Sequence, residues 1–197
     1  MLLSARRTLL LAALLSAAAV SIDPASRAST ADASPPHAPS AKTPSVSPCD
    51  TPQHHQFDFW VGDWRVFDST DGQLVGFDRV QKLEAGCVVQ QNLTLITDLY
   101  RRPGVAYRLD GIGVNRFDGE RWLELWADNQ WGAIALQGTP QGDKAMVMTS
   151  IVPSRNRDLR LVWERLPDGS VRALQYVAPA GSGKWTLYGN LLYRPNR

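Results

Sequence analysis

The sequence predicts an all-β protein: a single antiparallel up-and-down β-barrel of about 8–10 strands, preceded by a short helical turn. Three observations carry this prediction. Short segments rich in β-branched and aromatic residues follow one another through most of the chain, tight-turn signals separate them, and no stretch keeps a 3.6-residue apolar period over three helical turns.

Ten segments have strand character, from WRVFD near residue 64 to WTLYGNLLYR at the C-terminal end. The turn signals between them are Asp71-Gly72, Asp118-Gly119, Gln141-Gly142-Asp143, Pro167-Asp168-Gly169 and Gly181-Ser182-Gly183. Only HHQFDFWV, residues 54–61, has the pattern of a helical turn, and it precedes the first strand.

The N-terminal part of the chain is predicted to serve export. Arg6 and Arg7 are followed by the apolar run TLLLAALLSAAAV, which is too short for a stable membrane anchor, so residues 1–22 are predicted to be an export signal. Residues 23–48 are rich in Pro, Ser and Ala and are predicted to form a disordered linker. The barrel domain is then residues 49–197, and the protein is expected to be periplasmic or secreted.

Charge excludes one class of partner. The predicted domain carries 17 Lys and Arg against 17 Asp and Glu, so the whole-chain excess of +2 lies in residues 1–48. A balanced domain without a basic stripe lacks the electrostatic signature of nucleic-acid binding.

The two cysteines, Cys49 and Cys87, predict one disulfide in an oxidising compartment. Two free thiols, or a metal site that combines Cys49 with His54 and His55, are the alternatives.

The Asp118-Gly119 turn predicts which side chains share a face. A two-residue loop there places one polar and aromatic set on one face, made up of Gly111, Gly113, Asn115, Trp122, Glu124 and Trp126. The aliphatic side chains Ile112, Val114, Leu123 and Leu125 lie on the other face. Small glycines facing large residues are expected to leave room for an indole.

A Gly-x-Trp motif at the start of the first strand, after a helical turn, resembles the calycin superfamily, which includes lipocalins, fatty-acid-binding proteins and nitrobindins. The resemblance implies that Trp64 lies at the closed end of the barrel and is covered by Arg194 through a cation–π contact. The aromatic residues Phe57, Phe59 and Trp60 would then close that end.

The domain looks more similar to an exported bacterial family of unknown function that opens with FDFW-x-G-x-W. The motifs that carry the resemblance stand in the family's order: FDFWVGDW, AGCVV, NRFDGERWLELWAD, DGSVRALQY and KWTLYGNLLYR. The chain departs from the family's pattern at Glu124, Gln91 and Val177, so the polar interior is expected to differ from that of other members.

The candidate site is an aromatic pocket with one carboxylate. Trp122, Trp126 and Asn115 are predicted to line the lumen around Glu124, with Tyr107 shaping the cavity and Trp131 near its edge. Burial between indoles would raise the pKa of Glu124, and a protonated carboxyl donates a hydrogen bond or acts as a general acid. In the alternative, the two Trp are packing residues and Glu124 is solvated or paired with Arg108 or Arg172.

No cofactor and no metal is expected, because all three histidines, His37, His54 and His55, precede the predicted strands. Two loops, TDLYRRPG and VPSRNRD, place Arg101, Arg102, Arg155 and Arg157 at strand ends, where they are either solvated or attract an anionic group.

Three functions are therefore expected in order. The first is an exported, lipocalin-like barrel that binds a small apolar or aromatic ligand. The second is an enzyme that uses the same lumen with Glu124 as proton donor, and the third is a structural module with a filled barrel. If the aliphatic face points outward, it also predicts a homodimer; no nucleic acid and no stable membrane anchor are expected.

Overall fold

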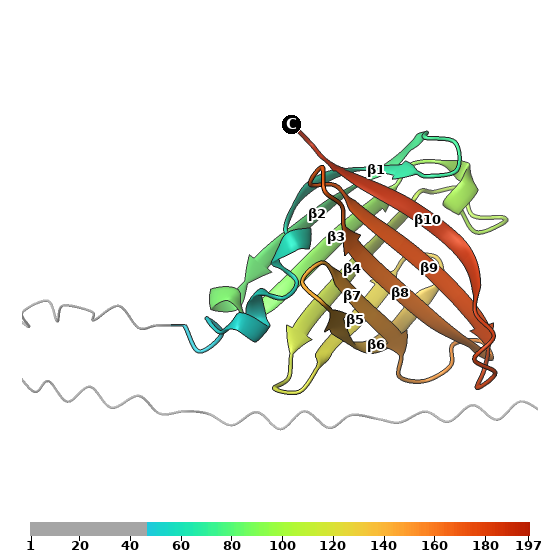
Figure 1. Cartoon of the computed structure of the whole chain (residues 1–197). Coiled ribbons are helices and arrows are strands. Elements are labelled where there is room, and N and C mark those ends of the chain that lie inside the picture. Colours follow the sequence, from blue (N-terminus) through green and yellow to red (C-terminus); the bar gives the residue numbers. More distant parts are fainter. Residues whose placement is uncertain (1–46) are drawn as a thin grey trace, which may run out of the picture. The chain divides into compact units, whose positions relative to one another are not determined.

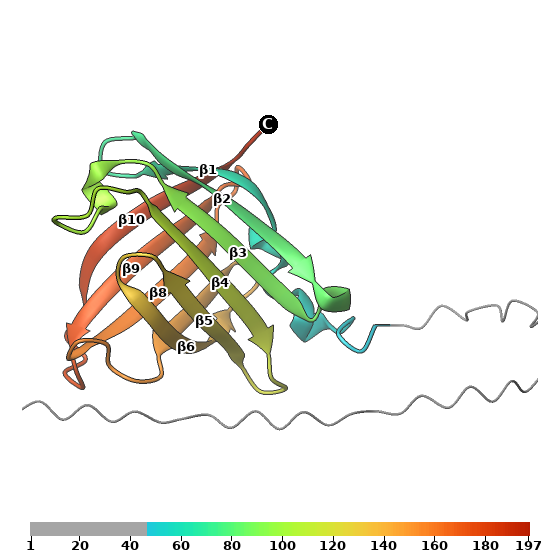
Figure 2. The same ribbon diagram turned by 180° about the vertical axis from the view of Figure 1, so that it is seen from behind.

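In the computed structural model, which describes residues 47–197, ten antiparallel strands close into one barrel (Figures 1 and 2). Each strand pairs with its neighbours in the sequence, and β1 pairs with β10 to complete the closure. The predicted all-β, up-and-down barrel is thus confirmed. The predicted export signal, residues 1–22, and most of the predicted linker, residues 23–48, lie outside the described residues.

The strands are joined by short turns and four single turns of 3-10 helix. The strands are β1 (Gly62–Asp68), β2 (Leu74–Leu83), β3 (Val88–Leu95), β4 (Leu109–Phe117), β5 (Trp122–Asp128), β6 (Gly132–Gln141), β7 (Ala145–Ser150), β8 (Arg157–Arg165), β9 (Val171–Pro179) and β10 (Thr186–Pro195). The helical turns are η1 (Pro52–His55), η2 (Asp58–Trp60), η3 (Glu84–Gly86) and η4 (Asp98–Tyr100). None of these helical turns has the length and apolarity needed to cross a bilayer.

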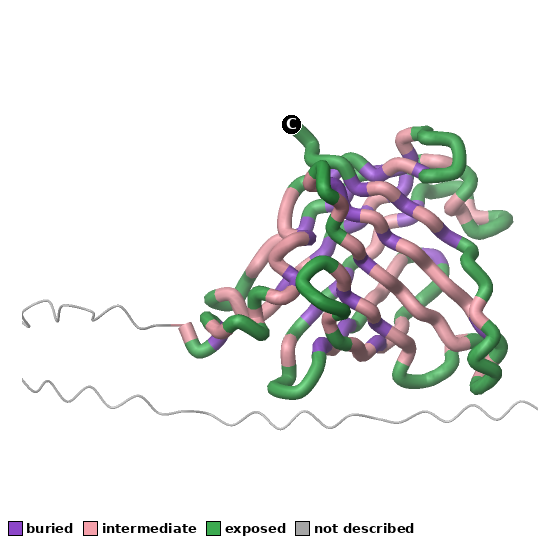
Figure 3. Tube along the Cα trace, in the orientation of Figure 1, coloured by how far each residue is buried: buried purple, intermediate pink, exposed green. Residues whose placement is uncertain are grey.

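Alternation along each strand builds the barrel wall. In β3, the side chains of Val89, Gln91, Leu93 and Leu95 are buried, while the residues between them are at least partly exposed. The same alternation is visible along most strands in Figure 3. It follows from the two-residue period of a strand, which points successive side chains to opposite faces of the sheet.

The up-and-down topology gives the barrel two different ends. The turns at residues 84–87, 118–121, 142–144 and 166–170 lie at one end, and the N-terminal segment 47–61 crosses the same end (Figures 1 and 2). We call this end, with the inward side chains next to it, the closed half. The loops at residues 69–73, 96–108, 129–131, 151–156 and 180–185 surround the other end, which we call the mouth of the open half.

The N-terminal segment plugs the closed half. Phe57 and Trp60 are fully buried and stack on each other with ring centroids 5.0 Å apart. Phe57 also meets Trp122 and Trp163 edge to face, each at 5.5 Å. Phe59 is half-buried against the same cluster. These edge-to-face and stacked contacts stabilise the aromatic cluster in addition to the free energy that burial of its apolar surface contributes.

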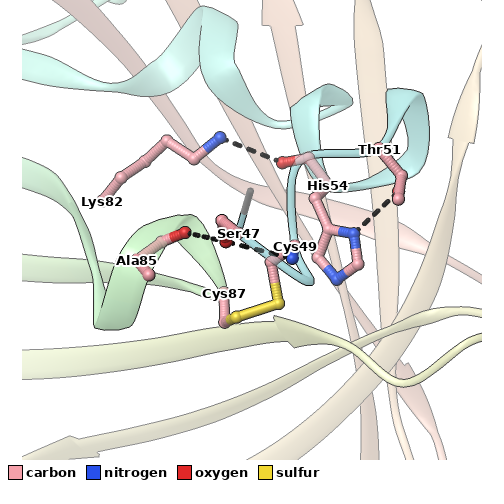
Figure 4. Close-up of a disulfide and its surroundings, with 7 residues drawn as sticks. All are labelled: Ser47, Cys49, Thr51, His54, Lys82, Ala85 and Cys87. Carbon is pink, nitrogen blue, oxygen red and sulfur yellow. Dashed lines mark hydrogen bonds between the residues drawn. A yellow bond between two sulfur atoms is a disulfide. The ribbon is translucent and has the colours of Figure 1, made fainter. Parts of the chain in front are cut away.

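The Cys49–Cys87 disulfide ties this plug to the barrel, as predicted (Figure 4). The two Cα atoms are 5.0 Å apart, and Cys87 lies just before β3. Ser47 reinforces the junction, because its hydroxyl donates to the carbonyl of Ala85 and accepts from the amide of Cys49. His54 and His55, which could have formed a metal site with Cys49, make local hydrogen bonds: His54 bonds Thr51, and His55 bonds both Asp50 and Asp58.

The hairpin between β4 and β5 differs from the prediction in its register. The predicted loop had two residues, but Phe117 pairs with Trp122 and the loop spans residues 118–121. The carboxylate of Asp118 accepts hydrogen bonds from the amides of Glu120 and Arg121, which stabilises the wider turn. The shift is two residues, so every side chain stays on its predicted face.

The predicted contact between Trp64 and Arg194 is wrong. Arg194 pairs with Arg65 across the β1–β10 ladder and lies outside, 5.0 Å from the ring of Phe67. Trp64 is inside, where its indole N–H donates to the carbonyl of Trp60 at 2.9 Å. Adjacent strand positions face opposite ways, so Arg194 cannot reach the inward side that Trp64 occupies.

The predicted aliphatic face points outward. Ile112, Val114 and Leu125 are 39%, 41% and 57% exposed, and Leu123 is half-buried beside them. A homodimer through this surface stays a prediction.

Candidate ligand-binding site in the barrel lumen

The inner wall of the barrel is filled in the closed half and accessible in the open half. On β5 to β9, the inward side chains toward the mouth are all partly accessible: Trp126, Ile134, Ser150, Leu159, Leu161, Gln175 and Val177. On the same strands toward the plug, Trp122, Leu136, Met146, Met148 and Trp163 are buried. The inner wall of the open half is therefore partly accessible and mainly apolar.

Trp126 lines the β4 side of the open half. A Cβ atom placed on Gly111 would lie 2.2 Å from the indole ring, so the ring lies directly against the glycine backbone. The indole N–H donates to the carboxylate of Asp128 at 2.9 Å, which fixes the ring's orientation. The glycine makes room for the indole, as predicted, although the indole packs diagonally across the hairpin and not against its directly paired residue, Gly113.

Glu124 lies one inward position deeper on β5. Its side chain is 3% exposed, and its Oε2 atom is buried without a hydrogen-bond partner among the described residues. The predicted alternative of an Arg108 partner is wrong, because the Arg108 guanidinium bonds Asp110 on the outside. Glu124 is thus a buried acid whose polar atom is unsatisfied within the protein.

A second buried acid, Asp78 on β2, completes the polar cluster. Gln91 donates to the carboxylate of Asp78 at 2.6 Å. The other side of Gln91 borders Gly113, where a Cβ would lie 3.0 Å from its Oε1 atom and 3.1 Å from Oε1 of Glu124. Gly113 therefore lets the two polar side chains approach each other over β4 from the two strands that flank it, β3 and β5.

Asn115 sits beside Glu124 as its directly paired residue on β4. Its amide donates to the carbonyl of Val89 at 3.3 Å, and its Oδ1 atom has no partner among residues 47–197. Asn115 anchors the cluster to β3 and leaves an acceptor inside the barrel.

Burial changes the ionisation of both acids. Burial, together with the smaller effect of the nearby Asp78 carboxylate, raises the pKa of Glu124 to about 8. Burial also raises the pKa of Asp78 to about 7, against the opposing effect of the hydrogen bond from Gln91. Glu124 is therefore mainly protonated at neutral pH, when it is a hydrogen-bond donor rather than a charge.

The turn after β5 organises the mouth. The carboxylate of Asp128 accepts from the backbone amides of Gln130 and Trp131 and, through its other oxygen, from the indole of Trp126. Gln130 is buried, and its side chain bonds Tyr107 and Arg102 in the 96–108 loop. This short turn thus connects Trp126, inside the barrel, with the 96–108 loop on the rim.

The predicted site residues occupy three places. Glu124, Asn115 and Trp126 gather inside the barrel. Trp122 is also inside but belongs to the plug contacts, since its indole N–H donates to Gln56 and its ring meets Phe57 and Phe117. Tyr107 and Trp131 are 55% and 46% exposed on the rim.

The sequence prediction missed Asp78 and Gln130. Asp78 stands two positions from Val80 and from Gly76 in β2, so strand alternation places it on their inward side. That signal was present in the sequence. The role of Gln130 depends on the conformation of two loops, which strand periodicity does not specify.

The structure has two surface concavities. One of about 150 Å³ lies along β1 to β3, where outward residues line it together with Trp64 and Asp78, and another of about 270 Å³ lies beside Asp143, Lys144 and Arg165. In residues 47–197, no group of three His, Cys, Asp or Glu side chains is arranged to hold a metal ion. Comparison with protein-family models and with curated proteins finds no match to this chain.

Proposed function

We propose that this protein is an exported, lipocalin-like barrel that binds a small apolar or aromatic molecule in the open half of its lumen. The observation that carries the proposal is the contrast along the inner wall: Trp126, Ile134 and Leu161 face inward yet remain accessible, above a buried acid with an unsatisfied oxygen. Concave, mainly apolar surfaces with a few convergent polar groups are typical of small-molecule sites.

Export is supported by the disulfide, which persists in oxidising compartments. The basic and apolar character of residues 1–22 supports it independently. We also propose membership of the exported family that opens with FDFW-x-G-x-W, on the five motifs that occur in order along residues 57–194.

The roles of the lumen residues follow from their chemistry. Trp126 would stack on a flat ring, Ile134 and Leu161 would contact apolar surface, and protonated Glu124 would donate a hydrogen bond to a ligand oxygen or nitrogen. Such a bond would satisfy the deepest polar group of the site, so a ligand with an acceptor at its inner end is favoured over a pure hydrocarbon.

The proposal is tested first by mass spectrometry of small molecules released from natively purified protein. A binding titration with the uncharged fluorophore N-phenyl-1-naphthylamine then locates the site. Ile134→Trp fills the lumen and is expected to weaken binding by at least about tenfold. Ala133→Trp, on the neighbouring outward position, is the matched control and should change little. If both variants bind the fluorophore like the wild type, the lumen is not the site and the barrel is a filled structural module.

A second candidate function rests on the raised pKa of Glu124. A carboxyl that is protonated near neutrality beside a second acid has the property of a general acid. Glu124→Gln keeps the shape and a hydrogen-bond donor but cannot transfer a proton. Incubation of the released molecule with each protein distinguishes the two functions. Conversion by the wild type that Glu124→Gln abolishes indicates an enzyme, while equal binding and no conversion indicates a carrier.

A further inference from the structure

An exposed tryptophan at the mouth lies close to two arginines. Trp131 stands at the tip of the β5–β6 turn, and the guanidinium carbons of Arg102 and Arg155 are 5.9 Å and 5.5 Å from its ring centroid. Arg102 comes from the 96–108 loop and Arg155 from the 151–156 loop. Two loops far apart in the sequence therefore bring positive charge to one indole.

Hydrogen bonds hold this arrangement in place. The backbone amide of Arg102 donates to the side chain of buried Gln130 at 2.7 Å, and its guanidinium donates to the Gln130 carbonyl at 3.1 Å. The guanidinium of Arg155 donates to the carbonyl of Trp131 at 3.2 Å. Both arginines keep further N–H donors free for another acceptor, because a guanidinium has five.

The positive charge of this pair is not neutralised locally. Nearby Arg101 and Arg108 each contact a carboxylate, Asp98 and Asp110 respectively. Within residues 47–197, neither Arg102 nor Arg155 has a carboxylate oxygen within 4.0 Å. The oxygens of Asp128 instead accept from backbone amides and from the Trp126 indole.

The rim and the lumen are joined by that same Asp128. It bonds the indole of Trp126 inside the barrel and the backbone of Trp131 on the rim. A molecule that reaches from one indole to the other would pass from an apolar surface to a pair of arginines. The site thus has one apolar end and one cationic end.

We propose that Arg102, Arg155 and Trp131 form an anion-binding subsite at the mouth, so that the ligand is an apolar or aromatic molecule ending in a carboxylate, sulfonate or phosphate. This inference rests on the proposed lumen site and specifies the class of its ligand. Guanidinium groups suit such anions because their planar N–H donors match two oxygens at once. Anchorage at the rim also leaves the inner end of the ligand free to meet Glu124.

Two fluorophores that differ mainly in charge test the subsite. Both 1-anilinonaphthalene-8-sulfonate and uncharged N-phenyl-1-naphthylamine carry the same two aromatic systems, and only the first carries an anion. Arg102→Gln/Arg155→Gln is expected to weaken binding of the sulfonate roughly five- to twentyfold and of the neutral fluorophore less than about twofold. The control Arg116→Gln/Arg165→Gln removes the same charge at the closed half and should leave both affinities unchanged. Arg102→Lys/Arg155→Lys should restore part of the loss by retaining charge.

The outcomes separate this inference from the proposed function. A selective loss of the sulfonate in the mouth variant, with lower affinity at higher salt, supports the subsite. Equal losses for both fluorophores, or the same sulfonate loss in the closed-half control, overturn the subsite and leave the lumen site standing. If the wild type binds neither fluorophore, the proposed lumen function itself fails. Thermal unfolding of each variant, expected within about 2 °C of the wild type, verifies that the fold is retained.

Discussion

The two halves of this barrel use the same strands and end in different states. Toward the plug, Trp60, Trp122 and Trp163 interlock with almost no exposed surface. Toward the mouth, Trp126 and Leu161 face the same way but remain accessible. Strand alternation alone does not cause this difference, since it points side chains inward in both halves. The N-terminal segment 47–61 supplies the extra aromatic residues, so it determines which half is core and which half is free for a ligand.

The largest expected effect is the difference in stability between a Trp→Ala variant in the closed half and one in the open half. Trp60→Ala removes a fully buried indole from the plug and is expected to lower the free energy of unfolding by about 4 kcal/mol. Trp126→Ala removes a half-accessible indole and should cost about 1–2 kcal/mol, because water already reaches one side of it. Urea unfolding of both variants, followed by circular dichroism, measures the difference.

The reverse order of these two costs would contradict the comparison, because it would make the open half the principal core. Phe77→Ala is a useful third variant. Phe77 is 41% exposed on the outside of β2, and its loss should change the unfolding free energy by less than about 1 kcal/mol.

The disulfide attaches the plug to the closed half, so its removal tests how much that attachment stabilises the barrel. The bond closes a loop with a sequence separation of 38 residues, for which chain entropy predicts a stabilisation of about 4 kcal/mol. Cys49→Ser/Cys87→Ser is therefore expected to lower the urea midpoint, and a reducing agent should lower the wild type to the same value. A reducing agent that also lowers the midpoint of the double variant would show that the effect does not come from this bond.

Much of the fold can be predicted from the sequence because side chains along a strand alternate between two faces. The loop between β4 and β5 is two residues longer than its Asp-Gly signal predicts, yet Trp126 and Glu124 lie on the predicted face. An even shift preserves faces, whereas an odd shift would have reversed them. The inward direction of Trp126 and Glu124 is therefore less sensitive to the length of the turn than the β4–β5 pairing is.

The remaining features depend on loops and on packing between distant segments. Tyr107 belongs to the rim because the 96–108 loop is held outside the barrel by Gln130. The role of Trp122 is set by its bond to Gln56, which lies 66 residues away. Arg194 meets Phe67 rather than Trp64 because it faces outward. The contacts of Tyr107 and Trp122 are not encoded in local periodicity, and a single sequence offers no other signal for them. The outward direction of Arg194, in contrast, follows from strand alternation, because the neighbouring Tyr193 faces inward.

The buried acid Glu124 predicts a pH dependence of stability. The pKa of Glu124 is about 8 in the folded protein, against an ordinary value near 4.5. Between these values the unfolded chain has lost the proton and the folded chain retains it, so stability falls as pH rises and levels off above pH ~8. Glu124→Gln removes this contribution.

We expect the stability of Glu124→Gln relative to the wild type to rise by on the order of 2 kcal/mol between pH 5 and pH 7. Urea unfolding at several pH values measures it. Glu120→Gln, in the exposed turn at the closed half, is the control and should show no such trend. A pH-independent difference between Glu124→Gln and the wild type would mean that Glu124 is solvated.

The smallest expected effect is also the most specific to the open half. Gly111→Ala places a methyl group 2.2 Å from the present position of the Trp126 ring, so the indole must leave the glycine surface. The φ angle at residue 111 is not positive, so the backbone tolerates alanine, and the indole is already partly accessible; the cost should therefore be only about 1 kcal/mol. The displaced ring, however, occupies the space that a ligand would use, and binding of N-phenyl-1-naphthylamine should fall more than stability does. Gly111→Ala/Trp126→Leu removes the clash and should recover the unfolding free energy of Trp126→Leu alone. If Gly111→Ala destabilises the barrel equally in both backgrounds, the glycine serves the β4 backbone rather than the indole.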